Sequence, residues 1–411
     1  MLSSSTHCTE SRSTHRPAYE LADILRRYLP DYLKTHRITY WQHKVLYDIQ
    51  VCRTAILGGH VEECDHCSYQ QPTYDSCHNR NCPKCFSIAM RQWVAKRLQE
   101  LLPVPYFHLV FTMPHSLNTL ALYNKKLIYK LFYQAASYTL LKFGRDPKHL
   151  GAQLGFIGVL HTWGKGLCYH IHWHFIVAGG GLTDDGQWLD LPAYDKFIFP
   201  VRAMSRVVGA RFIKLLRRAH DKGQLIISDA CEELNDDVMF EYFLTDLASE
   251  KWINYAKRPF GSPEQVVKYV GRYTHRVAIS NNRILSIDNG QIRFQVKDYR
   301  SGGDWETMAL PAELFIHRFV QHIVPKRFRK IRYGGFLAVG VRDEKLAQAR
   351  RDLDVIENAE DEAMILPEVL ATFAEIDEKL NCPVCMQGRM RRIEISAQRS
   401  SIHAGVHLDS S

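Results

Sequence analysis

Three histidines alternate along one short apolar stretch of the chain, at His170, His172 and His174. Aromatic and β-branched residues surround them, and the triple glycine 179–181 follows, a composition typical of a buried strand that ends in a glycine turn. Because alternate side chains of a strand share one face, the three imidazoles are predicted to point the same way. Neutral imidazole is a ready ligand for a divalent metal, so the row predicts a metal site; for any one histidine, a hydrogen-bonded place in the core is the alternative.

A predicted helix later in the chain carries two tyrosines that could act as nucleophiles. Ser262, Pro263 and Gln265 predict its start, as the N-cap, the first helical residue and the reciprocal capping partner. Tyr269 and Tyr273 are four residues apart and therefore share a face of this helix. Such a pair is more often a packed aromatic stripe, but cations beside a phenol favour phenolate and hold phosphates. The cations nearby are Lys268, Arg272, His275 and Arg276.

These two stretches together supply the parts for phosphodiester cleavage by a tyrosine. A metal on the histidine strand would polarise the phosphate, and a tyrosine oxygen would displace the 3′ oxygen in line.

The cysteines predict a structural zinc site. Two Cys-x-x-Cys pairs have the spacing of zinc knuckles, and the natural tetrahedral set is Cys64, Cys67, Cys82 and Cys85. Three nearby residues could replace one of these ligands or lie next to the site, namely Cys77, His66 and His78. A site of this kind closes its coordination sphere, so its role would be folding and not catalysis.

Basic residues in the same module, among them Arg80 and Lys84, are predicted to lie on phosphates. Near the end of the chain, Cys382 and Cys385 form half of a second zinc clip. The residues that could complete this clip are His403 and His407.

Composition favours a globular protein with a polyanionic partner. The 411 residues include 53 Lys and Arg against 44 Asp and Glu, a formal net charge of +9. No run approaches the ~20 apolar residues of a membrane span, and residues 1–16 lack the apolar core of a secretion signal. Because Cys-x-x-Cys pairs are typical of reducing compartments, we expect a cytoplasmic protein.

The elements that must position these residues alternate between strands and helices. Helical spacing of apolar residues predicts a helical lead-in over residues 19–50 and helices at 86–102, 127–143, 201–218 and 239–246. Strands are predicted at 106–113, at 154–161 and over the histidine row, with a loop at 179–192. This alternation favours a sheet with helices on one face, and the histidine strand is expected in its middle.

The C-terminal part is basic and aromatic. Residues 291–333 interleave cations with rings, a pattern that suits single-stranded DNA, whereas a β-rich surface with solvated charges is the alternative. The segment 326–332 is predicted to contact phosphate, and residues 344–380 are predicted to be helical.

Several of these motifs resemble the insertion-sequence-91 family of rolling-circle transposases. That family belongs to the HUH endonucleases, which are named for histidine, hydrophobe, histidine. The resemblance lies in His172-Trp173-His174 followed by glycines, in the tyrosine stretch 269–280 and in the cysteine module around residues 79–85; residues 106–114 and 161–164 also resemble it. It covers roughly residues 58–284, with the motifs in order.

The resemblance implies an α+β protein, a ferredoxin-like HUH nuclease palm with a central antiparallel sheet, preceded by a small zinc-binding module. The implied division is a leader and helical lead-in (1–55), a zinc-binding domain (56–95), a nuclease domain (96–290) and a basic, aromatic C-terminal region (291–411). The implied activity is that of a transposase that nicks and joins single-stranded DNA through a 5′-phosphotyrosine intermediate. Its partners would be transposon ends and target DNA in the bacterial cytoplasm, with the protein associated with the nucleoid.

Carried over by position, Tyr269 and Tyr273 would be the nucleophiles, while His172 and His174 would bind Mg or Mn. The structural zinc would be held by the cysteines. DNA would be bound by Lys268, Arg272, Arg276, Arg80 and Lys84. The third ligand of the catalytic metal is left open between two candidates, His170 and Gln265.

Two alternatives belong to other classes, and a third belongs to the same catalytic class. A zinc-stabilised DNA-binding protein without catalysis explains the charge and the cysteines but gives the histidine row and the tyrosines no role. A hydrolase of small phosphoesters needs neither the basic C-terminal region nor paired tyrosines. A plasmid replication initiator or relaxase would use similar parts, and the cysteine module favours a transposase over it.

Overall fold

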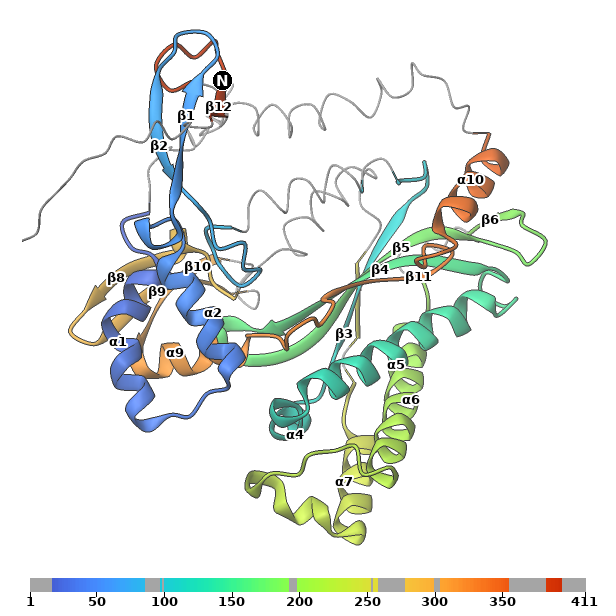
Figure 1. Ribbon diagram of the computed structural model, residues 1–411. Coiled ribbons are helices and arrows are strands. Elements are labelled where there is room, and N and C mark those ends of the chain that lie inside the picture. The colour runs from blue at the N-terminus through green and yellow to red at the C-terminus, as the bar shows by residue number, and fades with distance from the viewer. Residues whose placement is uncertain are drawn as a thin grey trace, which may run out of the picture.

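The computed structural model of the chain describes residues 17–85, 97, 100–191, 198–252, 254–257, 278–298, 304–354 and 382–393. Its central element is a sheet in which the strands lie in the order β11-β4-β5-β3-β7, with β6 paired to β5 (Figure 1). The strands are β3 (Tyr106–Thr112), β4 (Gln153–Trp163), β5 (Tyr169–Leu182), β6 (Trp188–Asp190), β7 (Asn254–Lys257) and β11 (Ile331–Gly335). All neighbours are antiparallel, and the histidine strand β5 lies in the middle, as predicted.

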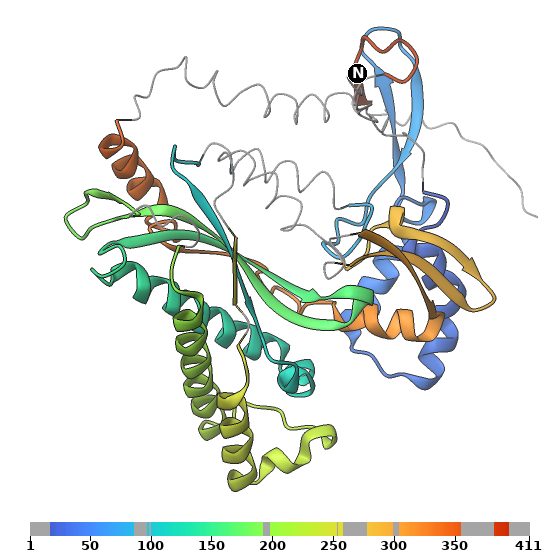
Figure 2. The ribbon, with the colours of Figure 1, turned by 180° about the vertical axis from the view of Figure 1, so that it is seen from behind.

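Helices pack on one face of this sheet (Figures 1 and 2). They are α4 (Asn118–Tyr123), α5 (Lys125–Arg145), α6 (Val201–Asp221) and α7 (Asp237–Ser249). Every second side chain of β5 is apolar and buried against them, including Ile171, Trp173 and Phe175. Because side chains of a strand alternate between faces, the histidines of β5 project to the opposite face.

Among the described residues, a smaller apolar cluster covers one end of that opposite face. Helix α10 (Arg342–Asp352) contributes Leu346 and Ala349 to this cluster, and the sheet contributes Val159 and Ile176. Ile176 lies on the same face of β5 as the histidines, two residues beyond His174. The histidine face is therefore continuous with the face that α10 covers.

A second unit joins the first helices of the chain to strands from its C-terminal half. Helices α1 (Leu21–Thr35) and α2 (Tyr40–Val51) share one core with β8 (Ile284–Asp288), β9 (Gln291–Asp298), β10 (Asp304–Pro311) and α9 (Ala312–Gln321). Long-range hydrogen bonds fasten them, since the Trp41 indole donates to the Val324 carbonyl at 3.0 Å and the Leu21 amide donates to Asn281 Oδ1 at 3.1 Å.

A third, small sheet has the order β12-β1-β2. Its strands are β1 (Gly59–Cys64), β2 (Gln70–Tyr74) and β12 (Met390–Ile393), so a hairpin from the N-terminal part of the chain pairs with the last described strand. Both views show β12 beside β1 and β2, away from the central sheet (Figures 1 and 2). Short 3₁₀ helices complete the described chain at Ala55–Leu57, His115–Leu117, Lys165–Leu167, Asp229–Asn235 and Asn281–Arg283.

The structure confirms most of the predicted elements and corrects one. The lead-in forms α1 and α2, and the strands and helices expected between residues 106 and 246 lie within one to five residues of their predicted bounds, roughly the usual uncertainty of helix and strand ends. The glycine run 179–181, predicted to turn into a loop, instead continues β5, and β6 forms within the predicted loop. Most of the helix expected at 86–102 and most of that expected at 344–380 lie outside the described residues.

The glycines continue the strand because neighbouring chains approach them closely. A Cβ on Gly179 would lie 2.7 Å from the Pro105 carbonyl oxygen, and one on Gly181 would lie 2.6 Å from that of Gln153. At Gly180 the Trp188 ring occupies the same space. Only glycine admits strands and a tryptophan ring at this distance.

Within the described residues, no helix has the length and apolarity needed to cross a bilayer.

Candidate functional site

Four histidines from three adjacent strands meet on the face of the central sheet opposite α5 and α6. They are His108 on β3, His161 on β4, and His172 and His174 on β5. Their strand neighbours on alternate positions, such as Phe111, face the helical core, so the pleat directs the histidines away from it. The site is therefore built on rigid strands and not on loops.

Strand register brings three of these histidines into metal-binding range. His161 is paired with His172 across β4 and β5, and His174 is paired with Val159 on the same strand. A ligand nitrogen from each of His161, His172 and His174 lies within 4.8 Å of the other two. The ring centroids of His161 and His174 are 4.5 Å apart, and those of His172 and His174 are 4.8 Å apart.

The environment of His172 favours its neutral form. Burial lowers the pKa of His172 to about 3, and the nearby His170 and His108 rings add to the effect. His161 and His174 are 2% and 9% exposed. Since a metal binds imidazole only in its deprotonated form, a low pKa leaves the lone pair available at neutral pH.

His108 supports the trio from the neighbouring strand. Its Nε2 is hydrogen-bonded to Nδ1 of His174 at 2.8 Å, with the rings parallel at an angle of 4°. The bond engages one nitrogen of His174, which leaves Nε2 as the atom that can face a metal. The side chain of His108 is 2% exposed, so the pair is fixed inside the sheet.

His170, one of the two candidates for the third ligand, does not belong to the trio. Its Nδ1 lies 3.2 Å from Nε2 of His115, and the two rings stack at 5.0 Å. The structure brings His161 to the position beside His172 and His174 instead. His161 was missed as a ligand because period-two spacing identifies ligands only within one strand. Its signals in the sequence were its place at the end of the preceding predicted strand and in the stretch 161–164, which resembles the family.

The remaining predicted catalytic residues lie outside the described part of the chain. This applies to Gln265, Lys268, Tyr269, Arg272, Tyr273 and Arg276. The described chain reaches their segment through β7, which pairs with β3, the strand that carries His108. In the sheet order, β7 is therefore two strands from β5.

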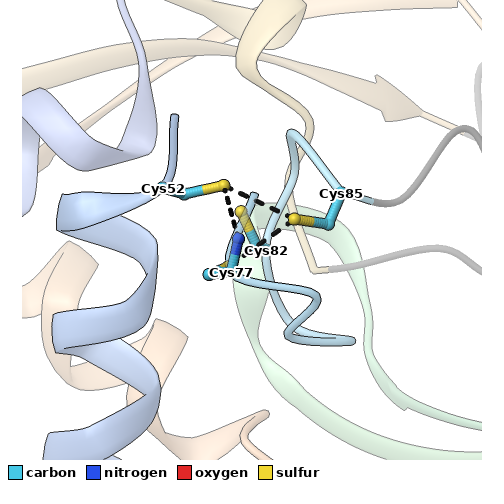
Figure 3. A group of neighbouring side chains, drawn as sticks. All are labelled: Cys52, Cys77, Cys82 and Cys85. Atoms are coloured by element: carbon cyan, nitrogen blue, oxygen red, sulfur yellow. Dashed lines mark hydrogen bonds between the residues drawn. The ribbon is translucent and has the colours of Figure 1, made fainter. Parts of the chain in front are cut away.

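A separate cluster of four cysteines lies between α2 and the loop that follows β2 (Figure 3). It consists of Cys52, Cys77, Cys82 and Cys85, whose sulfurs all lie within 4.8 Å of one another. The sulfur of Cys85 is 3.4 Å from that of Cys52 and 3.6 Å from that of Cys77. These separations approach the ~3.8 Å edge of a tetrahedron with zinc-to-sulfur distances of about 2.3 Å.

Thiolate is available in this cluster. Hydrogen bonds from Cys77 and Cys82 lower the pKa of Cys52 to about 7. Cys52 and Cys82 are fully buried in the core shared by α1, α2 and α9. A zinc ion held here would therefore stabilise that core, in keeping with a structural and not a catalytic role.

The structure corrects the predicted set of zinc ligands, because its four cysteines belong to two different clusters. Cys82 and Cys85 join Cys52 and Cys77, whereas Cys64 and Cys67 lie with Cys382 and Cys385. The reason is that β2 separates the two Cys-x-x-Cys pairs along the chain. A strand of five residues spans roughly 17 Å at about 3.3 Å per residue, too far for both pairs to share one ion.

Arg80 and Lys84, predicted to bind DNA, make internal contacts. The Arg80 guanidinium donates to the carbonyls of Phe328 and Pro325, the latter at 2.8 Å. The Lys84 ammonium lies 2.5 Å from a Glu20 carboxylate oxygen and donates to the Cys52 carbonyl at 3.2 Å. Both side chains thus connect the cysteine module to other parts of the fold.

The basic segment 326–332 has two kinds of cation. Lys326, Arg327 and Arg329 are exposed. Lys330 and Arg332 instead pack on aromatic rings: the Lys330 ammonium is 5.1 Å from the Trp163 ring centroid, and the Arg332 guanidinium is stacked over several rings. Burial lowers the pKa of Lys330 to about 8. The exposed members are the ones placed to meet a phosphate.

Comparison with known proteins places these features in context. Residues 155–345 match a family model described as "Putative transposase", and residues 24–113 match one described as "Transposase zinc-binding domain". The first span includes the trio, and the second includes the cluster around Cys52.

Two curated proteins match nearly the whole chain. One, named "Putative transposase y4qJ", from Sinorhizobium fredii, is 43% identical over 384 residues, covering 92% of this chain and 96% of that protein. The other, named "Transposase for insertion sequence element IS801", from Pseudomonas savastanoi pv. phaseolicola, is 30% identical over 341 residues, covering 81% and 79%. No solved structure matches the fold.

Proposed function

Because the chain belongs to the insertion-sequence-91 family of transposases, we propose that it cuts and rejoins single-stranded DNA through a 5′-phosphotyrosine intermediate in rolling-circle transposition. The observation that carries the proposal is the convergence of His161, His172 and His174 on the face of the central sheet opposite α5 and α6. A DNA-binding protein without chemistry would have no use for three imidazoles whose ligand nitrogens lie within 4.8 Å of one another.

The topology supports a ferredoxin-like palm. In chain order the elements run β3, α5, β4, β5, α6, β7, which is the β-α-β-β-α-β arrangement of that fold. The corresponding strand order is β4-β5-β3-β7, with β11 added at one edge. We propose a nuclease domain at residues 96–290, to which β11 adds an edge strand, and a zinc-binding domain at 56–95, whose cysteine cluster includes Cys52 of the lead-in (1–55). The basic C-terminal region would be residues 291–411.

The donor set fits a divalent cation. Three nitrogen ligands from His161, His172 and His174 suit a transition metal better than Mg²⁺, which prefers oxygen ligands, so manganese is the better fit of the two expected ions. When bound, such an ion polarises the scissile phosphate and offsets the charge that develops on it. His170 and Gln265 are not needed to complete a three-histidine set.

The nucleophile in this proposal is Tyr269 or Tyr273. The phenol oxygen forms a bond to phosphorus while the bond from phosphorus to the 3′ oxygen breaks, and the 3′ oxygen leaves as a hydroxyl. The same step in reverse, with a different 3′-hydroxyl, joins strands. A second tyrosine allows a second strand to be held at the same time. Lys268, Arg272 and Arg276 would hold the phosphates beside it.

Adduct formation tests the proposal. The protein is incubated with labelled single-stranded DNA and Mn²⁺ or Mg²⁺, and denaturing electrophoresis detects a covalent protein-DNA species. We expect the adduct with the unmodified protein and its loss when both Tyr269 and Tyr273 are changed to Phe, or in His161→Ala. Tyr255→Phe, at an exposed tyrosine on β7, is the matched control and should form the adduct normally. An adduct that survives removal of both tyrosines would refute the assigned nucleophiles.

A further inference from the structure

The second cysteine cluster joins parts of the chain that are distant in sequence. Cys64 and Cys67 lie at the end of β1 and in the turn after it, and Cys382 and Cys385 lie just before β12. The sulfurs of Cys67 and Cys382 are 3.6 Å apart although the residues are separated by 315 positions. Those of Cys64 and Cys385 are 3.7 Å apart across 321 positions.

The geometry is that of a tetrahedral thiolate site. All four sulfurs lie within 4.8 Å of one another, and the two closest cross-chain pairs approach the ~3.8 Å sulfur-to-sulfur edge expected around zinc. Both halves are built as knuckles in which backbone amides donate to sulfur. The Cys67 amide donates to Cys64 at 3.4 Å, and the Gly388 amide donates to Cys385 at 3.3 Å. Such bonds favour the thiolate form that a metal requires.

Strand pairing holds the two knuckles in register. β1 and β12 are antiparallel, with Cys64 opposite Met390 and Glu63 opposite Arg391. Asp65 strengthens the junction, since its carboxylate accepts from the Arg389 amide at 2.7 Å and from the Arg391 guanidinium at 2.9 Å.

Close packing requires glycine at position 388. A Cβ on Gly388 would clash with the Cys64 sulfur and lie 2.5 Å from the Cβ of His66. Two segments separated by more than 300 positions in the sequence are thus in direct contact.

We propose that Cys64, Cys67, Cys382 and Cys385 bind a second zinc ion, which clasps the C-terminal segment to the β1–β2 hairpin and closes the chain between them into a loop. This zinc clasp is distinct from the cluster around Cys52, and half of it lies beyond both spans that match known families, residues 24–113 and 155–345. Closing so long a loop removes many conformations from the unfolded chain, so the ion is expected to stabilise the native protein.

Counting thiolate-bound metal tests the zinc clasp without relying on activity. The full chain is prepared with cobalt(II), whose thiolate charge-transfer absorbance reports cysteine sites and ignores the histidine trio. We expect two thiolate-bound cobalt ions per chain, falling to one in Cys382→Ser and in Cys67→Ser. Cys168→Ser, at an exposed cysteine outside both clusters, is the matched control and should retain two. One ion in the unmodified chain, or two in Cys382→Ser, would refute the clasp.

Hydrogen exchange tests the connection itself. If the ion joins the two segments, Cys67→Ser should accelerate amide exchange in Met390–Ile393 by at least about tenfold, although the substitution lies at the other end of the chain. Cys382→Ser should do the same to Gly59–Cys64. Unchanged exchange in β12 of Cys67→Ser would show that strand pairing alone holds the segment and would overturn the clasp. Elemental analysis that finds iron in place of zinc would overturn the choice of metal.

Discussion

Nε2 of His108 on β3 is hydrogen-bonded to Nδ1 of His174 on β5 at 2.8 Å. This bond fixes the orientation of a residue that faces the candidate catalytic cation, although His108 itself lies outside the trio. Partners of this kind raise the basicity of a ligand and hold its ring in place.

His108→Ala is expected to weaken Mn²⁺ binding by about 10- to 100-fold, the usual effect of removing a partner that orients a metal ligand. Calorimetric titration of Mn²⁺ checks this. His108→Asn, whose amide can still form a hydrogen bond, should recover part of the affinity. Equal loss in both variants would point to general disruption of the sheet instead of loss of the hydrogen bond.

His161 and His170 should behave differently. His161→Ala is expected to slow DNA cleavage by about 100-fold or more, because a bound cation supplies several kcal/mol and each 1.4 kcal/mol is a factor of ten in rate. His170→Ala should stay within a few-fold of the unmodified protein, since His170 pairs with His115 and not with the trio. Single-turnover cleavage rates of the two variants at saturating Mn²⁺ test this. If His170→Ala were the slower variant, His170 and not His161 would be the ligand.

Acid should destabilise the protein partly through His322. Burial lowers the pKa of His322 to about 3, and the charges of Lys125 and Lys330 act in the same direction. Below the ordinary histidine pKa of about 6.5, His322 is protonated in the unfolded chain but stays neutral in the native state. The free energy of unfolding should therefore fall as pH decreases from about 6.5 towards about 3, by at most about 1.4 kcal/mol per pH unit for this one group.

Comparison of urea unfolding at several pH values isolates this contribution. His322→Gln keeps a donor for the Leu167 carbonyl, which His322 Nε2 contacts at 2.9 Å, and should flatten the pH dependence. His43→Gln, at an exposed position of α2, is the control and should leave the slope unchanged. Burial also lowers the pKa of His172 to about 3, so His172 contributes in the same direction and part of the slope should remain.

Gly180→Ala should destabilise the central sheet by about 1–3 kcal/mol, the usual cost of overpacking. Its new Cβ would clash with the Trp188 ring and lie 2.7 Å from the Leu189 carbonyl oxygen, and backbone on β6 cannot move away cheaply. Gly164→Ala is the matched control, because the nearest atom to its Cβ is 3.4 Å away and its backbone is extended. Chemical denaturation measures both, and equal stability of the two variants would contradict the packing argument.

Local pattern determined much of this protein. The alternation of His170, His172 and His174 was enough to predict a strand with the histidines on one face, because side-chain direction in a strand depends only on neighbouring residues. Helical periodicity likewise predicted α1, α2, α5 and α6. The cysteine spacing correctly predicted that this chain has a zinc-binding module.

Tertiary structure decided which residues meet. His161 joins His172 and His174 only because β4 pairs with β5 in one particular register, and a shift of one residue would move it to the helical face. The cysteines regroup for a similar reason. A Cys-x-x-Cys pair supplies two ligands locally, but the other two are chosen by strand pairing across the chain, as Cys382 and Cys385 show when β12 pairs with β1. Spacing determines ligands that lie within one turn or strand, whereas contacts between distant segments depend on packing energies summed over the whole fold.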